Sequence, residues 1–202
     1  YQHSTDVGYR RRLLVCSHQL YTCVKIQFGA HIVEHDGSTG SHYSLLHIDS
    51  DTYALAYSGH RADGYITTFT IASDGSSITE VSGSILEHDE NKGEYNSLVH
   101  VDSDTYALAY TGTNANGFIS KFTISSDGSS IVKVKTLEHD TDVGNYNSLV
   151  HVGSDIYTLA YKSGQKDGWI NTFKIYQKIS SSSSTLLYAP HIHDAVTVSI
   201  NS

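Results

Sequence analysis

The sequence contains no methionine, a single proline and only two cysteines. It also has no apolar run near the roughly 18 residues that a membrane-spanning helix requires, so no membrane span is expected. Because the chain starts at Tyr1 and lacks methionine, we expect a processed or partial chain. No signal or transit peptide is recognisable in these residues.

Positive charge is also scarce. There are 13 Lys and Arg against 21 Asp and Glu, which gives a net charge of −8 with histidine neutral. This balance argues against nucleic acid or an anionic membrane surface as the main partner. No nucleophile elbow, zinc-protease motif, phosphate-binding glycine loop or dinucleotide fingerprint is present. The sequence therefore predicts a protein that is not an enzyme and has no cofactor.

The two cysteines, Cys16 and Cys23, lie seven residues apart on either side of a predicted turn. This spacing lets them face each other across a hairpin. A disulfide would form in an oxidising compartment, whereas in a reducing one the two thiols would act as small buried apolar groups. The sequence leaves both alternatives open.

The chain does contain strong internal repetition. The segment LVHVDSDTYALAY, Leu98 to Tyr110, recurs nearly unchanged at Leu45 to Tyr57 and at Leu149 to Tyr161. His-Asp pairs recur with spacings of 53, 51 and 54 residues, at His35-Asp36, His88-Asp89, His139-Asp140 and His193-Asp194. We therefore divide a single repeat domain, 1–202, into a shortened first unit (1–34), three full units (35–87, 88–138 and 139–192) and a closing strand (193–202).

Each full unit has the pattern of four short strands. In the second unit the strands are expected at 96–102, 105–110, 118–124 and 131–137. Ser103-Asp104 and Ser126 to Gly128 carry turn signals, and 138–144 is expected to link to the next unit. No segment has a helical period with caps, so the protein is predicted to be all-β with almost no helix.

The second strand of each unit alternates large and small side chains. In the second unit the large side chains are Tyr106, Leu108 and Tyr110, and the small ones are Thr105, Ala107 and Ala109. A large face can nest on the small face of a neighbouring unit, so both faces of each sheet would be covered. Four-stranded repeats of roughly 50 residues that pack in this way predict a β-propeller.

The number of blades follows less directly from the repeats. Three full units, with a first unit completed by the C-terminal strand, predict about four blades. In this interpretation Ala195 to Ile200 pairs with the N-terminal unit and hides the edge strands. The alternative is that the chain forms one arc of a larger or oligomeric ring.

Several segments resemble a known class of repeats. The segments LEHD, NSLVHVDSDTYALAY, DGYITTFTI and SDGSS resemble tandem β-propeller-type repeats of uncharacterised extracellular microbial proteins, over Ile32 to Ile175. The architecture is also similar to small lectin propellers, in which each blade carries a sugar pocket, although no lectin motif matches residue by residue. The resemblance implies an extracellular or cell-surface location.

Histidines at equivalent positions form the first candidate site. His47, His100 and His151 recur in the first strand of each full unit, and a ring of histidines could bind a metal ion. Val15 stands at the matching position of the first unit, which breaks the ring. We therefore favour repeated structural hydrogen bonds between blades, and no metal is expected.

The His-Asp pairs form the second candidate. A carboxylate beside a histidine can raise the pKa of the imidazole and orient the ring for base catalysis. A general base also needs a nucleophile and a cleft, however, and a pair that recurs in every unit favours a structural role. We expect the Asp to accept backbone N–H hydrogen bonds in a turn.

The third candidate lies just before the third strand of each unit. A polar residue, a glycine and an aromatic residue recur there, and the polar and aromatic members are Asp63, Tyr65, Asn116, Phe118, Asp167 and Trp169. An aromatic ring can stack on the C–H face of a sugar while the carboxylate or amide binds its hydroxyls. The alternative is a glycine-containing turn followed by a buried aromatic residue that begins a strand.

These observations predict a non-enzymatic extracellular binding module with one shallow carbohydrate site per blade. Its partner would be a glycan or another cell-surface polymer, and repeated weak sites would act together. The alternative function is a self-assembling structural or surface protein without a small-molecule ligand, present as a homo-oligomer.

Overall fold

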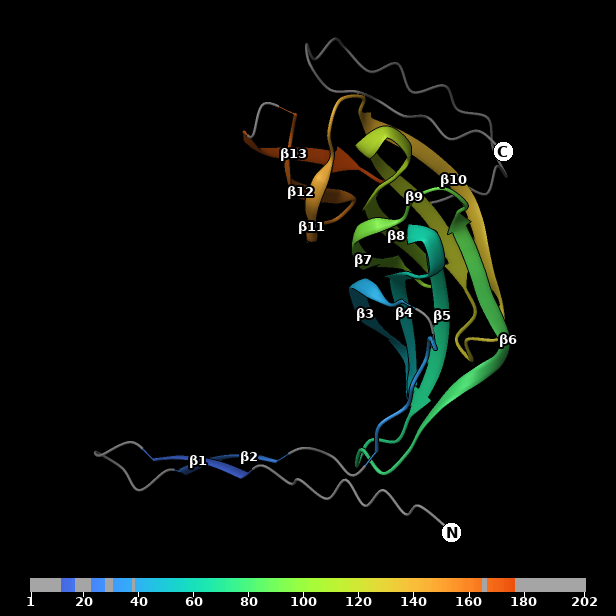
Figure 1. The fold of residues 1–202 in the computed structure, drawn as a ribbon, viewed down its shortest axis with the longest axis vertical. Coiled ribbons are helices and arrows are strands. Elements are labelled where there is room, and N and C mark those ends of the chain that lie inside the picture. The colour runs from blue at the N-terminus through green and yellow to red at the C-terminus, as the bar shows by residue number, and fades with distance from the viewer. Residues whose placement is uncertain (1–11, 17–22, 28–30, 38, 165–166, 177–202) are drawn as a thin grey trace.

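The computed structural model describes residues 12–16, 23–27, 31–37, 39–164 and 167–176 (Figure 1). These residues form a two-stranded sheet, two four-stranded sheets and one three-stranded sheet, and every strand pair is antiparallel. Within each sheet, successive strands of the chain are neighbours. The prediction of an all-β protein is confirmed over the described residues.

The strands have the following bounds. The N-terminal hairpin contains β1 (Arg12–Cys16) and β2 (Cys23–Gln27). Sheet 1 contains β3 (Ser41–Asp49), β4 (Thr52–Ser58), β5 (Gly64–Ile71) and β6 (Ile78–Asp89). Sheet 2 contains β7 (Glu94–Asp102), β8 (Thr105–Thr111), β9 (Gly117–Ile124) and β10 (Ile131–Asp140). Sheet 3 contains β11 (Asn145–Gly153), β12 (Ile156–Lys162) and β13 (Gly168–Lys174).

The predicted strands of the second unit agree with sheet 2 to within three residues at every boundary. Strand β10 continues to Asp140, so the His139-Asp140 pair lies at the end of a strand and not within a linker. A fourth strand for the third unit and the closing strand predicted over Ala195 to Ile200 fall outside the described residues. The four-strand pattern is therefore confirmed for two of the three full units.

The first hairpin of each sheet turns at a serine with a left-handed backbone. Asp102 pairs with Thr105, and Ser103 between them has a φ of 45°. Ser50 and Ser154 occupy the same position with φ values of 45° and 50°. The predicted tight turn at Ser103-Asp104 is confirmed and is repeated in all three sheets.

The three larger sheets stack side by side (Figure 1). Their first strands contact each other in order, β3 against β7 and β7 against β11. Figure 1 shows β6 and β10 on the opposite side of the stack from these first strands. Sheet 2 thus presents one face to sheet 1 and the other face to sheet 3.

The core lies between the sheets. We call the side of each sheet that carries the Tyr-x-Leu-x-Tyr residues its bulky face, and the opposite side its small face. Tyr106, Leu108 and Tyr110 of sheet 2 are buried in one cluster with Ala54 and Ala56 of sheet 1. A second cluster joins the small face of sheet 2 to the bulky face of sheet 3 and contains Ala107, Ala109, Tyr157, Leu159 and Tyr161. The predicted nesting of large on small side chains is confirmed at both junctions.

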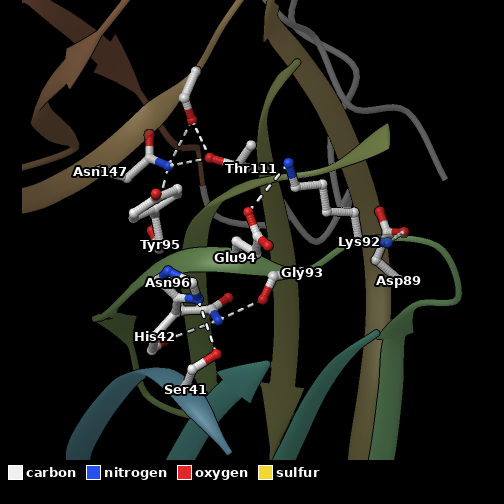
Figure 2. A network of polar contacts seen from close by, with 11 residues as sticks. Ser41, His42, Asp89, Lys92, Gly93, Glu94, Tyr95, Asn96, Thr111 and Asn147 are labelled. Atoms are coloured by element: carbon white, nitrogen blue, oxygen red, sulfur yellow. Dashed lines mark hydrogen bonds and ion pairs between the residues drawn. The ribbon is translucent and has the colours of Figure 1, made fainter. Parts of the chain in front are cut away.

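Polar contacts between the first strands reinforce this packing (Figure 2). The Leu98 N–H donates to Ser44 Oγ at 2.9 Å, and the Leu149 N–H donates to Ser97 Oγ at the same distance. The Asn96 amide donates to the His42 carbonyl of the neighbouring sheet at 3.1 Å. Asn147 Nδ2 makes the equivalent bond to the carbonyl of Tyr95 at 3.3 Å. The same bonds at both junctions show that the sheets meet in one repeated register.

The N-terminal hairpin pairs Cys16 with Cys23 directly across its two strands. The expectation that these residues lie opposite each other on a hairpin is therefore confirmed for the backbone. Among the described residues, no helix is long and apolar enough to cross a membrane.

Candidate functional site

The segment before each third strand is shaped by a short turn with an unusual backbone. In sheet 1, His60–Ala62 form a 3₁₀ turn in which Arg61 and Ala62 both have positive φ, 58° and 71°. In sheet 2, Thr113–Ala115 repeat this turn, with Asn114 at 60° and Ala115 at 67°. Such conformations are costly for residues other than glycine and are common at ligand-binding loops.

The aromatic residue that follows each turn lies opposite a tyrosine of the second strand. The rings of Tyr65 and Tyr57 are 5.6 Å apart between centroids, as are those of Phe118 and Tyr110. Trp169 pairs with Tyr161 in the same register and is half exposed. Phe118 also packs against the core between sheets 1 and 2. None of the three aromatic residues is buried, in contrast to the turn interpretation: Tyr65 and Phe118 are half-buried, and Trp169 is open to solvent.

A carboxylate that the sequence reasoning missed joins this set. Glu87 pairs with Tyr65 across β5 and β6, and Glu138 pairs with Phe118 across β9 and β10. The Tyr65 hydroxyl donates to Glu87 Oε1 at 3.3 Å, and Asn116 Nδ2 donates to Glu138 Oε1. The repeated LEHD segment contained the signal, because its Glu keeps a constant offset from the His-Asp pair.

Charge around the site affects the tyrosine. The pKa of Tyr65 is raised by partial desolvation and by the nearby carboxylates of Glu87 and Asp63. A phenol beside two carboxylates offers one donor and several acceptors, which suits a ligand rich in hydroxyl groups. No described residue of the set is a nucleophile activated by a base.

The structure does not bring the six predicted residues together. Asp63 and Tyr65 belong to sheet 1, Asn116 and Phe118 to sheet 2, and Asp167 and Trp169 to the start of β13 in sheet 3. Because each pair lies at the start of the third strand of its own sheet, the six residues form three separate pairs and not one composite pocket.

Two of the four His-Asp pairs, His88-Asp89 and His139-Asp140, have the predicted capping role, and His193-Asp194 lies outside the described residues. Asp89 Oδ1 accepts the N–H groups of Asn91 and Lys92, both at 3.0 Å. Asp140 Oδ1 accepts those of Asp142 at 2.9 Å and Val143 at 3.2 Å. The Asp therefore closes the turn that leads from one sheet to the next.

The histidine of each pair has a different role, which the sequence did not reveal. His88 is only 2% exposed and lies against the rings of Tyr110 and Phe122 in the neighbouring sheet, 4.7 and 6.4 Å away between centroids. Burial lowers the pKa of His88 to about 3 and that of His139 to about 4. Such a buried ring stays neutral and packs between two adjacent sheets.

The repeated first-strand histidines require a correction. His47, His100 and His151 were expected to form hydrogen bonds between blades, but each Nε2 bonds within its own hairpin, to the carbonyls of Ser50, Ser103 and Ser154 at 3.0, 3.1 and 2.8 Å. The acceptor is three residues further along, because the left-handed serine turns its carbonyl back toward the strand. Over the described part of the chain, no group of three His, Cys, Asp or Glu residues is placed to hold a metal ion.

Comparison with known proteins adds little to this geometry. No protein-family model matches the sequence, and no curated protein matches it. Two structures of NanB sialidase have a similar chain path, one of the K499G mutant from Streptococcus pneumoniae and one titled "NanB plus Optactamide". In each case the TM-score is 0.48, the identity is 9%, and the match covers 76% of this chain and 24% of the other.

Proposed function

We propose that the chain is a non-enzymatic glycan-binding module whose sheets are blades of a β-propeller. The nesting of each bulky face on the preceding small face, with first strands adjacent on one side of the stack, supports the assignment of the sheets as blades. In this arrangement the starts of the third strands occupy equivalent places in successive blades.

The observation that carries the proposal is the repeated set of an aromatic ring, a carboxylate and a second polar group. Tyr65 with Glu87 and Asp63 forms this set in sheet 1, where the phenol donates to Glu87. Phe118 with Glu138 and Asn116 repeats it in sheet 2, where the amide donates to Glu138. An aromatic face for sugar C–H groups beside acceptors for hydroxyls is suited to carbohydrate recognition.

Each site would be shallow and weak on its own. One site per sheet gives the chain several equivalent sites, and a polymeric glycan that contacts two of them gains avidity from the high effective concentration of the second. This favours a partner that is a glycan or another cell-surface polymer over a free monosaccharide. It also implies a location outside the cell or at its surface.

A glycan array tests the proposal. The full chain is expected to bind a subset of immobilised oligosaccharides, and Trp169→Ala is expected to reduce that signal by at least threefold. Tyr176→Ala is the matched control, because Tyr176 is also an exposed aromatic residue but follows the opposite end of β13. No binding to any glycan, or an equal loss in both variants, contradicts the proposal.

A further inference from the structure

Among the residues that the structure describes, none covers the small face of sheet 3, although the same face is covered in the two sheets before it. Ile66, Ile119 and Ile170 occupy equivalent positions on the small faces of sheets 1, 2 and 3, where they pair with Ala56, Ala109 and Ala160. Ile66 is 0% exposed and Ile119 8%, whereas Ile170 is 74% exposed. Val150 and Val152 on the same face are also exposed, whereas their counterparts Val99 and Val101 pack against the core.

The complementary gap lies at the other end of the stack. Leu98 and Leu149 on the bulky faces of sheets 2 and 3 are 5% and 4% exposed, because each is covered by the sheet before it. Their equivalent in sheet 1, Leu45, is 57% exposed. The stack therefore begins with an open bulky face at its first strand and ends with an open small face.

The serine and leucine groups that form hydrogen bonds at the internal junctions also lack this partner, among the described residues, at the two ends of the stack. Ser44 and Ser97 each accept the N–H of a leucine in the following sheet. Ser148 holds the same position in sheet 3, is exposed, and accepts no such bond within the described residues. The corresponding leucine N–H at the start of the stack is that of Leu45.

An aromatic column along the first strands ends in the same way. His42, Tyr95 and Tyr146 all have positive φ, and their rings follow one another at centroid distances of 4.3 and 4.4 Å. Tyr146 is the exposed last member of this column in sheet 3, and His42 is its first member in sheet 1.

We propose that the small face of sheet 3 binds the bulky face of sheet 1 in a second copy of this chain. This contact would repeat the first-strand register of the two internal junctions. Ile170, Val150 and Val152 would cover Leu45, Ser148 would accept the Leu45 N–H, and Tyr146 would extend its column onto His42. Among the described residues, sheet 1 presents the one bulky face whose first strand is exposed, whereas Leu55, Tyr57 and Phe69 on its second and third strands are already buried.

The contact joins two different faces, and every copy carries both of them, the small face of sheet 3 and the bulky face of sheet 1. A head-to-tail contact of this kind closes into a ring when the rotation permits and otherwise builds a chain of copies. One internal bond is lost at the new junction, because Tyr43 stands where Asn96 and Asn147 supply their amides. The contact between copies is therefore weaker than the internal junctions and depends on concentration. It does not depend on glycan binding.

Light scattering coupled to size exclusion tests the contact without any glycan. The full chain at high concentration is expected to show at least twice the mass of one chain. Ile170→Glu and Leu45→Glu each place a charge in the contact at a side chain that is already exposed, so each variant is expected to fold and to remain a single chain. Val132→Glu is the matched control, because Val132 is a similarly exposed apolar side chain on β10 of the middle sheet, and it is expected to associate like the original.

Mixing the two single-chain variants gives the decisive result. Ile170→Glu retains an intact sheet 1 face and Leu45→Glu an intact sheet 3 face, so the mixture is expected to form a pair and nothing larger. Circular dichroism of each variant confirms folding. A single-chain mass for the original protein at all concentrations, an equal effect of Val132→Glu, or no pairing in the mixture would overturn the proposal.

Discussion

The imidazole of His88 meets the ring of Tyr110 edge to face, with 4.7 Å between their centroids, although the two residues belong to adjacent sheets. The pair is repeated by His139 with Tyr161 at 4.8 Å and by His35 with Tyr57 at the same distance. Each sheet therefore receives a histidine from the segment that precedes it. The Asp of the same pair closes the turn, so two neighbouring residues serve two junction functions.

Stability is expected to fall as the pH is lowered from about 6.5 toward 4. Burial depresses the pKa of His88 to about 3 and that of His139 to about 4, from an ordinary value of 6.5. Below pH 6.5 these histidines bind protons in the unfolded chain but stay neutral in the folded chain. The free energy of unfolding is therefore highest above this pH and falls below it. Each histidine contributes a slope of up to about 1.4 kcal/mol per pH unit.

Urea unfolding between pH 7 and pH 4.5 measures this slope. His139→Ala is expected to lower stability at pH 7 by about 2 kcal/mol through lost packing. It is also expected to reduce the slope below pH 6.5 by about 1.4 kcal/mol per pH unit. An unchanged slope in the variant would show that His139 does not remain neutral in the fold.

The nesting of large on small side chains predicts a sharp contrast between equivalent alanines. Ala109→Leu adds volume where Ala109 is fully buried against sheet 3, and is expected to cost about 3 kcal/mol. Ala160→Leu makes the same change on the uncovered small face, and is expected to change the stability of a single chain by less than about 0.5 kcal/mol. Thermal unfolding of both variants at low concentration measures the difference, and equal losses would contradict the nesting.

Close approach of two backbones predicts a severe effect at one glycine. A Cβ on Gly93 would lie 2.2 Å from Gly64 Cα, which is backbone and cannot move aside easily. Gly93→Ala is therefore expected to destabilise the protein by more than about 2 kcal/mol. Gly153→Ala is the control, because nothing lies within 4 Å of its added Cβ. Denaturant midpoints compare the two, and a harmless Gly93→Ala would show that the junction is loose.

The serine bonds between first strands can be tested in the same paired manner. Ser97→Ala removes the acceptor of the Leu149 N–H at a largely covered junction, and is expected to cost about 1–2 kcal/mol of unfolding free energy. Ser148→Ala is expected to be neutral for a single chain and to weaken the association of copies. Similar unfolding free energies for the two variants would argue against a repeated register.

The all-β architecture could be predicted from the sequence because every repeat contains the same pattern of strands and turns. The alternation of Tyr106, Ala107, Leu108 and Ala109 determines two faces of different size, and its recurrence identifies what each face meets. The Asp side chain of the His-Asp pair was also predictable, because short carboxylates often accept backbone N–H groups in turns.

Contacts across a junction could not be predicted in the same way. Nothing local in the sequence shows that the His88 ring points into the next sheet, because that depends on the space left by Gly64 and Gly93. The pairing of Glu87 with Tyr65 depends on a register set by bulges in β6. The direction of the His100 hydrogen bond depends on the left-handed backbone at Ser103. The presence of a serine does not predict that conformation.

Glycan binding at the starts of the third strands is tested most directly by comparing matched variants on one array. The double variant Tyr65→Ala/Trp169→Ala is expected to lose at least tenfold in signal on the glycans that the full chain binds, because two sites that act together are removed. Each single variant is expected to lose less, and Tyr176→Ala is expected to lose nothing. Equal signals for the full chain and the folded double variant would contradict carbohydrate recognition at these residues.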